Sequence, residues 1–161
     1  MNKQTDTKDT MANFITYTEF LNSGLPVSDD ISQYEVEFSI NSTEEFYVKP
    51  ALTDENYLAL LEDPTNVMVT GGTEDGKHYA GIKQAMYHLV FAWMIVNDYR
   101  VTRYSTVEKN SEYSKSTDSE KLELLAKRHW EMGEAFLREV QDHYNIDHHN
   151  DRNNLFTTLL W

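Results

Sequence analysis

Four residues near the C-terminal end carry side chains that could bind a metal ion. His143, Asp147, His148 and His149 lie close together in the sequence, and imidazole and carboxylate groups suit Zn²⁺. The surrounding segment is polar and supplies no framework that would fix a tetrahedral site. A solvated helix end is therefore the favoured interpretation, and a metal-dependent enzyme that uses this cluster remains a third functional hypothesis.

The glycine-rich sequence GGTEDG at residues 71–76 could serve a different chemistry, the binding of phosphate. It lacks the Gly-Lys-Ser/Thr ending and the glycine spacing of the nucleotide-binding motifs. Val67–Thr70 precede it and Lys77–Tyr79 follow it. The pattern therefore predicts a β-hairpin over Val67–Tyr79, with the glycines in its turn.

No other pattern indicates catalysis. The chain has no cysteine, which excludes a cysteine nucleophile and a thiolate metal site. His88 and His129 each lie on an apolar helical face, where a histidine is more often a hydrogen-bonded core or interface residue than a general base. The spacings of serine hydrolases, zinc proteases and EF-hands are absent. The sequence therefore predicts neither an enzyme nor a cofactor.

The charge of the chain restricts its partners. The 161 residues include 27 acidic and 14 basic side chains, which give a formal net charge of −13. A face that binds nucleic acid needs clustered Lys and Arg, and the basic residues here are scattered. A negative surface is compatible with DNA that slides past it. The longest apolar run, Leu89–Val96, has eight residues against the ~20 needed to cross a bilayer, so no membrane partner is expected.

The hydrophobic pattern predicts a mainly α fold, namely a small helical bundle with a β-hairpin and an extended insertion between its two longest helices. One long helix is expected at Ile82–Tyr99, where apolar residues cover almost every side. The other is expected to begin with a capping box at Thr117–Glu120 and to end near Tyr144.

Shorter helices are expected before the hairpin. The first follows Thr16 or Thr18. The second begins at Asp29–Asp30, with Ser28 as its N-cap, and ends at Pro50. It places four apolar residues near helical spacing: Ile31, Tyr34, Phe38 and Phe46.

The segment between the two long helices, residues 97–114, is polar and rich in aromatic residues, and it contains neither Gly nor Pro. Its β-branched and aromatic residues predict an extended conformation. Because the neighbouring sequence offers little sheet for it to pair with, we expect this insertion at a subunit boundary, against another copy of the chain. Its candidate interface residues are Arg100, Val101, Arg103, Tyr104, Val107 and Tyr113.

Three parts are expected along the chain: a disordered arm at residues 1–12, a helical domain at 13–145 and a tail at 146–161. The tail ends in five large apolar side chains after a polar spacer. It either folds back onto the core of its own subunit or acts as an assembly peptide that docks on a neighbour. Its candidate interface residues are Leu155, Phe156, Leu159, Leu160 and Trp161.

Several segments together resemble the head-to-tail connector (adaptor) proteins of tailed bacteriophages, most closely those of crAss-like and related phages of gut Bacteroidetes. They are FITYTEFLN, EEFYVKPALTDENYLALLE, GGTEDGKHYAGIKQAMYHLVFAWMI and VTRYSTVEKNSEYS, and they span about residues 14–144. The closest points of resemblance are Tyr47–Leu52 and the segment from Val101 to Tyr113. The tail after Asn145 has no counterpart in that family.

The resemblance implies a subunit of a closed ring, typically twelve-fold, that lies beneath the portal and extends the DNA channel. The implied partners are other copies of the chain, the portal protein and other tail or connector proteins, while DNA passes through without sequence-specific binding. Such a protein is a structural component of the virion at the head-tail interface, assembled in the host cytoplasm. The alternative hypothesis is a small acidic protein-binding module, either a DNA mimic or an inhibitor of a host protein.

Overall fold

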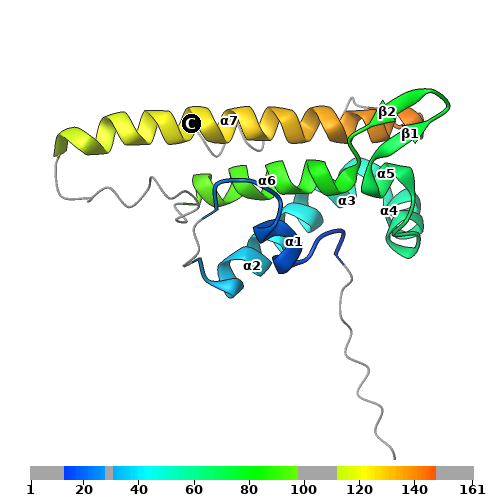
Figure 1. Ribbon diagram of the computed structural model, residues 1–161, viewed down its shortest axis with the longest axis horizontal. Coiled ribbons are helices and arrows are strands. Elements are labelled where there is room, and N and C mark those ends of the chain that lie inside the picture. The colour runs from blue at the N-terminus through cyan, green and yellow to red at the C-terminus, as the bar shows by residue number, and fades with distance from the viewer. Residues whose placement is uncertain (1–12, 28–30, 98–111, 148–161) are drawn as a thin grey trace, which may run out of the picture.

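The computed structural model describes residues 13–27, 31–97 and 112–147, with the side chains of the last helix described from residue 120 onward. Nearly all of the regular structure in this part is helical, and a two-stranded antiparallel hairpin is added to it (Figure 1). This confirms the predicted fold class. The elements in order are α1 (Tyr17–Leu21), α2 (Gln33–Thr43), the π-helix η1 (Glu44–Val48), α3 (Lys49–Leu52), α4 (Asp54–Glu62), α5 (Val67–Thr70), β1 (Gly72–Glu74), β2 (Lys77–Tyr79), α6 (Ile82–Val96) and α7 (Glu112–His143).

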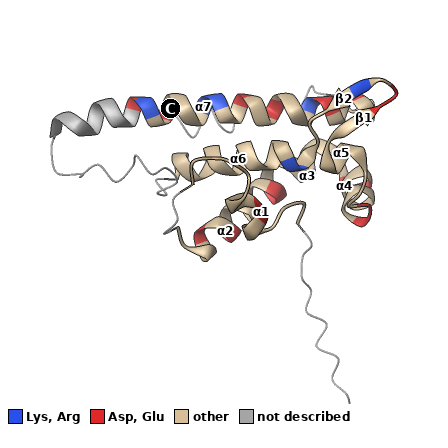
Figure 2. Ribbon diagram, in the orientation of Figure 1, with Lys and Arg blue, Asp and Glu red and all other residues tan. Residues whose placement is uncertain are grey.

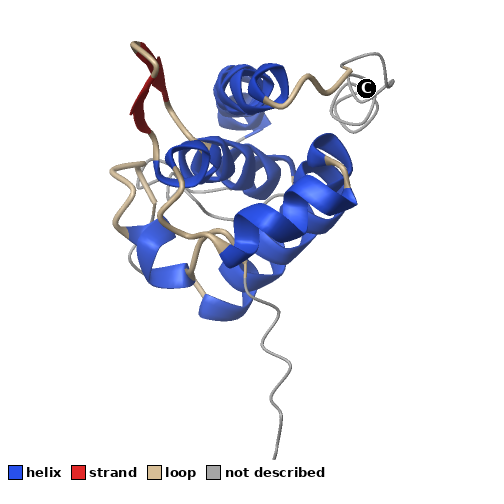
Figure 3. Cartoon of the chain, turned by 90° about the vertical axis from the view of Figure 1, so that its right-hand side faces the viewer, coloured by secondary structure: helices blue, strands red, loops and turns tan. Residues whose placement is uncertain are grey.

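Helix α6 forms the centre of the fold. It lies between α7 on one side and the layer of α1 and α2 on the other (Figures 1 and 3). Four consecutive residues, Leu89–Ala92, have no exposed surface, so burial extends around the helix instead of following one stripe. The prediction that this helix is buried on several sides is confirmed.

Helices α6 and α7 come into close contact at Gly133. A β-carbon on this residue would lie 2.6 Å from Cγ of Leu89 and 3.0 Å from the carbonyl oxygen of Ala85. On either side of Gly133, Trp130 and Leu137 of α7 are buried. The absence of a side chain at Gly133 thus allows the backbones of the two longest helices to come together.

The hairpin is shorter than predicted, because Val67–Thr70 form the helical turn α5 and not a strand. The side chain of Asn66 accepts a hydrogen bond from the backbone N–H of Met68 at 2.9 Å, which caps this turn. Gly71, with a φ of +80°, then ends it. The local cap overrides the β-propensity of the two valines. The strands pair in the register Gly72↔Tyr79, Thr73↔His78 and Glu74↔Lys77.

Helix α2 begins later than predicted. The helical segment that it starts continues through η1 and α3, so Pro50 does not end it. Its N-cap is Ser32, whose hydroxyl accepts a hydrogen bond from the N–H of Glu35 at 3.1 Å, while Ser28 lies outside the described residues. Pro50 lies in the first turn of α3, which continues directly from η1. Proline has no N–H, and in a regular α-helix its ring would clash with the carbonyl of Phe46. The wide π-helical turn just before it accommodates the proline.

Helix α7 begins at Glu112, before the predicted capping box. Thr117 is therefore inside the helix and is not its N-cap, and Tyr113 is helical and not extended. The sequence from Glu112 to Glu120 contains neither Gly nor Pro, so no strong helix breaker stops the helix from extending in this direction.

Candidate functional site

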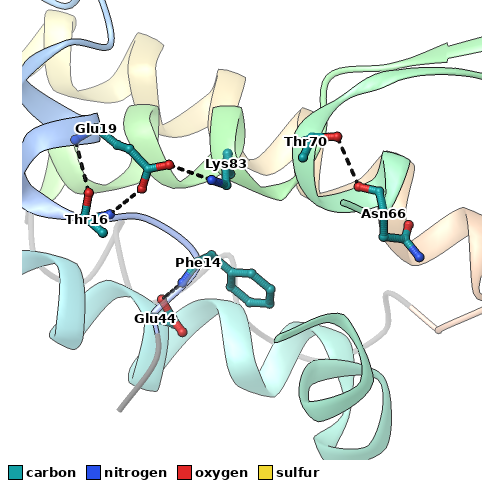
Figure 4. A network of polar contacts seen from close by, with 7 residues as sticks. All are labelled: Phe14, Thr16, Glu19, Glu44, Asn66, Thr70 and Lys83. Atoms are coloured by element: carbon teal, nitrogen blue, oxygen red, sulfur yellow. Dashed lines mark hydrogen bonds and ion pairs between the residues drawn. The ribbon is translucent and has the colours of Figure 1, made fainter. Parts of the chain in front are cut away.

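One buried carboxyl group lies at the junction of the N-terminal segment, η1 and α4. Glu44 is 1% exposed, and its Oε2 accepts a hydrogen bond from the N–H of Phe14 at 3.0 Å (Figure 4). Its Oε1 accepts a second hydrogen bond, from the hydroxyl of Tyr57 at 2.7 Å. Burial raises the pKa of Glu44 to about 7, and the neighbouring charge of Glu45 adds to this effect, against the two hydrogen bonds. A carboxyl group with such a pKa could transfer protons near neutral pH.

The surroundings of Glu44 favour a structural role over catalysis. The rings of Phe14 and Tyr57 pack edge to face, with their centroids 5.5 Å apart. Burial, together with the nearby carboxyl group of Glu44, raises the pKa of Tyr57. Both described partners of Glu44 are protein groups, so its hydrogen bonds tie the start of the folded chain to η1 and α4.

Two histidines meet between the longest helices. Nδ1 of His88 on α6 lies 2.8 Å from Nδ1 of His129 on α7, and the two rings are nearly parallel. Phe91 contacts the ring of His129 and Phe136 contacts that of His88. Burial, with a smaller effect from His129, lowers the pKa of His88 to about 4, and burial also lowers the pKa of His129. The pair is therefore neutral at pH 7, with one nitrogen donating the shared proton and the other accepting it.

Polar contacts fix the outer elements to this core. Lys83 of α6 donates to Oε1 of Glu19 at 2.6 Å, and Glu19 and Thr16 form the capping box of α1 (Figure 4). The same close-up shows Thr70 donating to the carbonyl of Asn66 at 3.2 Å, within α5. The contact of Lys83 with Glu19 positions α1 against α6, and the contact of Thr70 closes the turn of α5.

Further contacts hold η1 and α3 against α7. The hydroxyl of Tyr47 donates to Oε1 of Glu134 at 2.6 Å, and Nε2 of Gln141 donates to the carbonyl of Ala51 at 3.0 Å. The ring of Tyr47 also packs on that of Trp130, with centroids 4.7 Å apart. Two residues in the closest point of the sequence resemblance, Tyr47 and Ala51, thus contribute to internal packing.

The predicted metal cluster falls only partly within the described residues. His143 lies at the end of α7, with Nε2 3.7 Å from Oε2 of Glu74 in the hairpin, and Asp147 is exposed. His148 and His149 lie outside the described residues. Among the side chains of residues 13–27, 31–97 and 120–147 there is no group of three or more His, Asp or Glu residues that could hold a metal ion.

The predicted interface residues lie almost entirely outside the described part of the chain. Tyr113 belongs to α7, and its side chain is not described. The interface assignments therefore remain predictions. The others, all outside the described residues, are Arg100, Val101, Arg103, Tyr104, Val107, Leu155, Phe156, Leu159, Leu160 and Trp161.

The structure exposes an aromatic pair that the sequence pattern had placed on an apolar face of α2. Tyr34 is 76% exposed and Phe38 is 46% exposed, and their rings stack with centroids 6.3 Å apart. The opposite side of α2 enters the core through Val36 and Ile40. Phe46, in the same predicted set, is also exposed, whereas Ile31 is buried as expected.

A second group of exposed apolar side chains lies on the outside of α7. Leu124 is 52% exposed and Met132 is 43% exposed, and Arg128 lies between them on the same side of the helix. Neither residue was among the predicted site residues. Their spacing carries a signal, because Leu124 and Met132 lie off the buried stripe of α7 that contains Ala126, Gly133 and Val140.

Residues 48–150 match the family of unknown function DUF6712. The chain belongs to this family. No curated protein and no solved structure matches the chain. The DUF6712 region contains α3–α7, and with them the histidine pair, the close contact at Gly133 and the exposed side of α7. The helices α1 and α2 precede it. None of the described helices combines the length and the apolar character needed to span a membrane.

Proposed function

We propose that the protein is a structural virion component, a subunit of a dodecameric ring that joins the portal to the tail and extends the DNA channel. It works by assembly, without a reaction or a cofactor. The proposal comes from the resemblance to phage connector proteins, and the mainly helical fold agrees with it. The match to DUF6712 carries no functional description and neither favours nor opposes it.

One structural observation supports assembly most strongly, namely that large apolar side chains are exposed on both outer layers of the subunit. The stacked Tyr34 and Phe38 lie on α2, and Leu124 and Met132 lie on α7. An exposed, contiguous aromatic pair marks a contact surface more often than an isolated apolar residue does. A ring subunit needs two such surfaces, because each copy contacts one neighbour on either side.

The charge of the chain fits a channel through which DNA moves. A net charge of −13 leaves little tendency to form the phosphate contacts that would have to be broken during packaging and ejection. Figure 2 shows acidic residues on α1, α2, α4, α7 and the hairpin, and most of the basic residues also lie along α7.

The mass of the assembled complex tests this proposal. We expect the purified protein to form a ring when it is mixed with portal rings, even if it is a monomer alone. A protein that stays monomeric in both conditions and is absent from the head-tail interface of particles would contradict the proposal.

A small acidic protein-binding module is the second candidate. Helix α4 and the turn after it carry four exposed carboxylates without a described Lys or Arg partner: Asp54, Glu55, Glu62 and Asp63. Exposed carboxylates at both ends of a helix could imitate DNA phosphates for a host protein. Binding of a host DNA-binding protein by a monomer, without ring formation, would favour this candidate.

A further inference from the structure

Four exposed residues form one side of helix α2, which we call the α2 face. Tyr34, Glu37, Phe38 and Asn41 follow the spacing of one helix side. The aromatic rings of Tyr34 and Phe38 stack on each other, and Glu37 lies beside them. The described partner of the Glu37 carboxylate is the neutral amide of Gln33, at 2.8 Å. The α2 face is thus aromatic with one uncompensated negative charge.

Helix α7 presents a face of complementary character, the α7 face, formed by Lys121, Leu124, Arg128, Met132 and Ala135. All five are exposed and lie on one side of the helix. Within the described part of the chain, neither Lys121 nor Arg128 has a carboxylate within ion-pair distance. The α7 face is thus aliphatic with two uncompensated positive charges.

The two faces cannot meet within one subunit. Helix α6 lies between α7 and the layer that contains α2 (Figures 1 and 3). The α2 face and the α7 face are both on the outside of their layers, since their residues are exposed. A contact between them requires a second molecule.

We infer that the α2 face of one copy packs on the α7 face of the next copy. This inference rests on the proposed ring and identifies the surfaces that join neighbouring subunits. The partner of each face is another copy of this chain. The chain carries both an apolar face with a negative charge and an apolar face with positive charges, and these two faces complement each other. Each copy then uses two different surfaces, which produces a head-to-tail series that closes into a ring or continues as a filament.

The chemistry of the two faces agrees with this arrangement. The rings of Tyr34 and Phe38 can cover the side chains of Leu124 and Met132, and apolar contact supplies most of the energy of such interfaces. Arg128, which lies between these two residues, can stack on an aromatic ring. At the edge, Glu37 and Lys121 can attract each other, which favours one orientation of the neighbour.

The absence of native cysteine makes disulfide trapping a direct test. Phe38→Cys is made in one full-length chain, and Leu124→Cys, Arg128→Cys or Met132→Cys in another. A disulfide forms only where the two Cα atoms come within about 7 Å. Three positions along α7 are therefore tested, so that one of them lies opposite Phe38 whichever way the two helices are aligned. The control chain carries Glu62→Cys, an exposed position on α4.

Mixing Phe38→Cys with at least one α7 variant on portal rings, under mild oxidation, should give disulfide-linked heterodimers at least about tenfold faster than mixing it with the Glu62→Cys control under the same conditions. A chain with cysteines on both faces should give a ladder of covalent oligomers. If all three pairs form disulfides no faster than the control, the inference is wrong.

A second experiment separates this inference from the proposed function. The variant Tyr34→Ser/Phe38→Ser removes the α2 face, and Leu124→Ser/Met132→Ser removes the α7 face; all four residues are exposed, so the fold is retained. Neither variant should form rings on portal, whereas a mixture of the two on portal should give pairs of subunits, one of each variant, joined through the intact pair of faces. Normal rings from either variant would overturn the inference and leave the ring proposal intact. Failure of the wild-type chain to form any ring would overturn both.

Discussion

The Nδ1 atoms of His88 and His129 lie 2.8 Å apart between the two longest helices. A hydrogen bond at this distance needs one proton on one of the two nitrogens, and protonation of both would place two donors against each other. The charged residues next to His129 along α7, Lys127, Arg128 and Glu131, are all exposed. The pKa values of the two histidines are therefore lowered mainly by burial, and that of His88 also by the neighbouring His129.

The histidine pair should resist protonation until the pH is well below the ordinary range for histidine. Because the folded state lowers the pKa of His88 to about 4 from an ordinary value of 6.5, it binds this proton less tightly than the unfolded state. The contribution of neutral His88 to the stability of the fold is therefore fully present above pH 6.5 and is lost as the pH falls towards 4. NMR of the imidazole nitrogens should show that the ring of His88 is still neutral at pH 6. A His88 ring that is protonated at pH 6 would contradict this expectation.

Replacing Gly133 with Ala should destabilise the fold, although alanine is the better helix former. A β-carbon at this position would lie 2.6 Å from Cγ of Leu89, so α6 and α7 would have to separate. The cost of overpacking exceeds the gain in helix propensity, so we expect the free energy of unfolding to fall by at least about 1 kcal/mol in total. Thermal or urea unfolding measures it, with Ala135→Ser on the exposed side of α7 as the control. An unchanged or higher midpoint for Gly133→Ala would show that the two helices are not in close contact.

The carboxyl group of Glu44 should make the fold less stable as the pH rises towards neutrality. Its pKa is about 7 in the folded state against an ordinary value of 4.5, so the folded state binds the proton more tightly. The contribution is fully present below pH 4.5 and is lost as the pH rises through 7. It amounts to at most about 3 kcal/mol.

The variant Glu44→Gln should remove this dependence, because an amide can accept from Phe14 without ionising. We expect it to be more stable than the wild type at pH 8 and close to it at pH 4.5, measured by urea unfolding across the range. Glu37→Gln, at an exposed position on α2, is the control and should leave the pH profile of the wild type. An identical profile for Glu44→Gln and the wild type would mean that Glu44 is not buried as described.

The tail should act in assembly and not in folding. Deletion of residues 150–161 removes all five apolar candidates without touching the described core. We expect an unchanged midpoint of thermal unfolding for the monomer and failed incorporation into particles. Internal replacement of Leu155 and Phe156 with Ser provides a milder version of the same test. Loss of thermal stability on deletion would instead support the alternative, in which the tail folds back onto its own subunit.

The sequence predicts a helix or strand well where all of its local preferences favour the same structure. Ile82–Val96 is apolar around most of its circumference and contains no Gly or Pro, and the helix forms as expected. The short helix α1 likewise begins directly after Thr16, one of its two expected starts, and the structure shows a capping box there. At Val67–Thr70 two local preferences compete, and the cap from Asn66 outweighs the β-propensity of the valines.

The exposed faces and the histidine pair could not be derived from spacing alone. Helix α2 has apolar residues on two sides, and a helical period does not tell which side meets the core: Val36 and Ile40 do, whereas Tyr34 and Phe38 do not. The two paired histidines are 41 residues apart, and their contact depends on how α6 and α7 pack.

Imaging of particles that contain the protein tests the central proposal most directly. A label fused to the chain should appear at the head-tail interface, and the reconstruction there should show twelve helical subunits in a closed ring beneath the portal, with a channel wide enough for duplex DNA. A particle in which the labelled chain lies elsewhere, or a protein that occurs only as a free monomer bound to a host protein, would contradict the proposal.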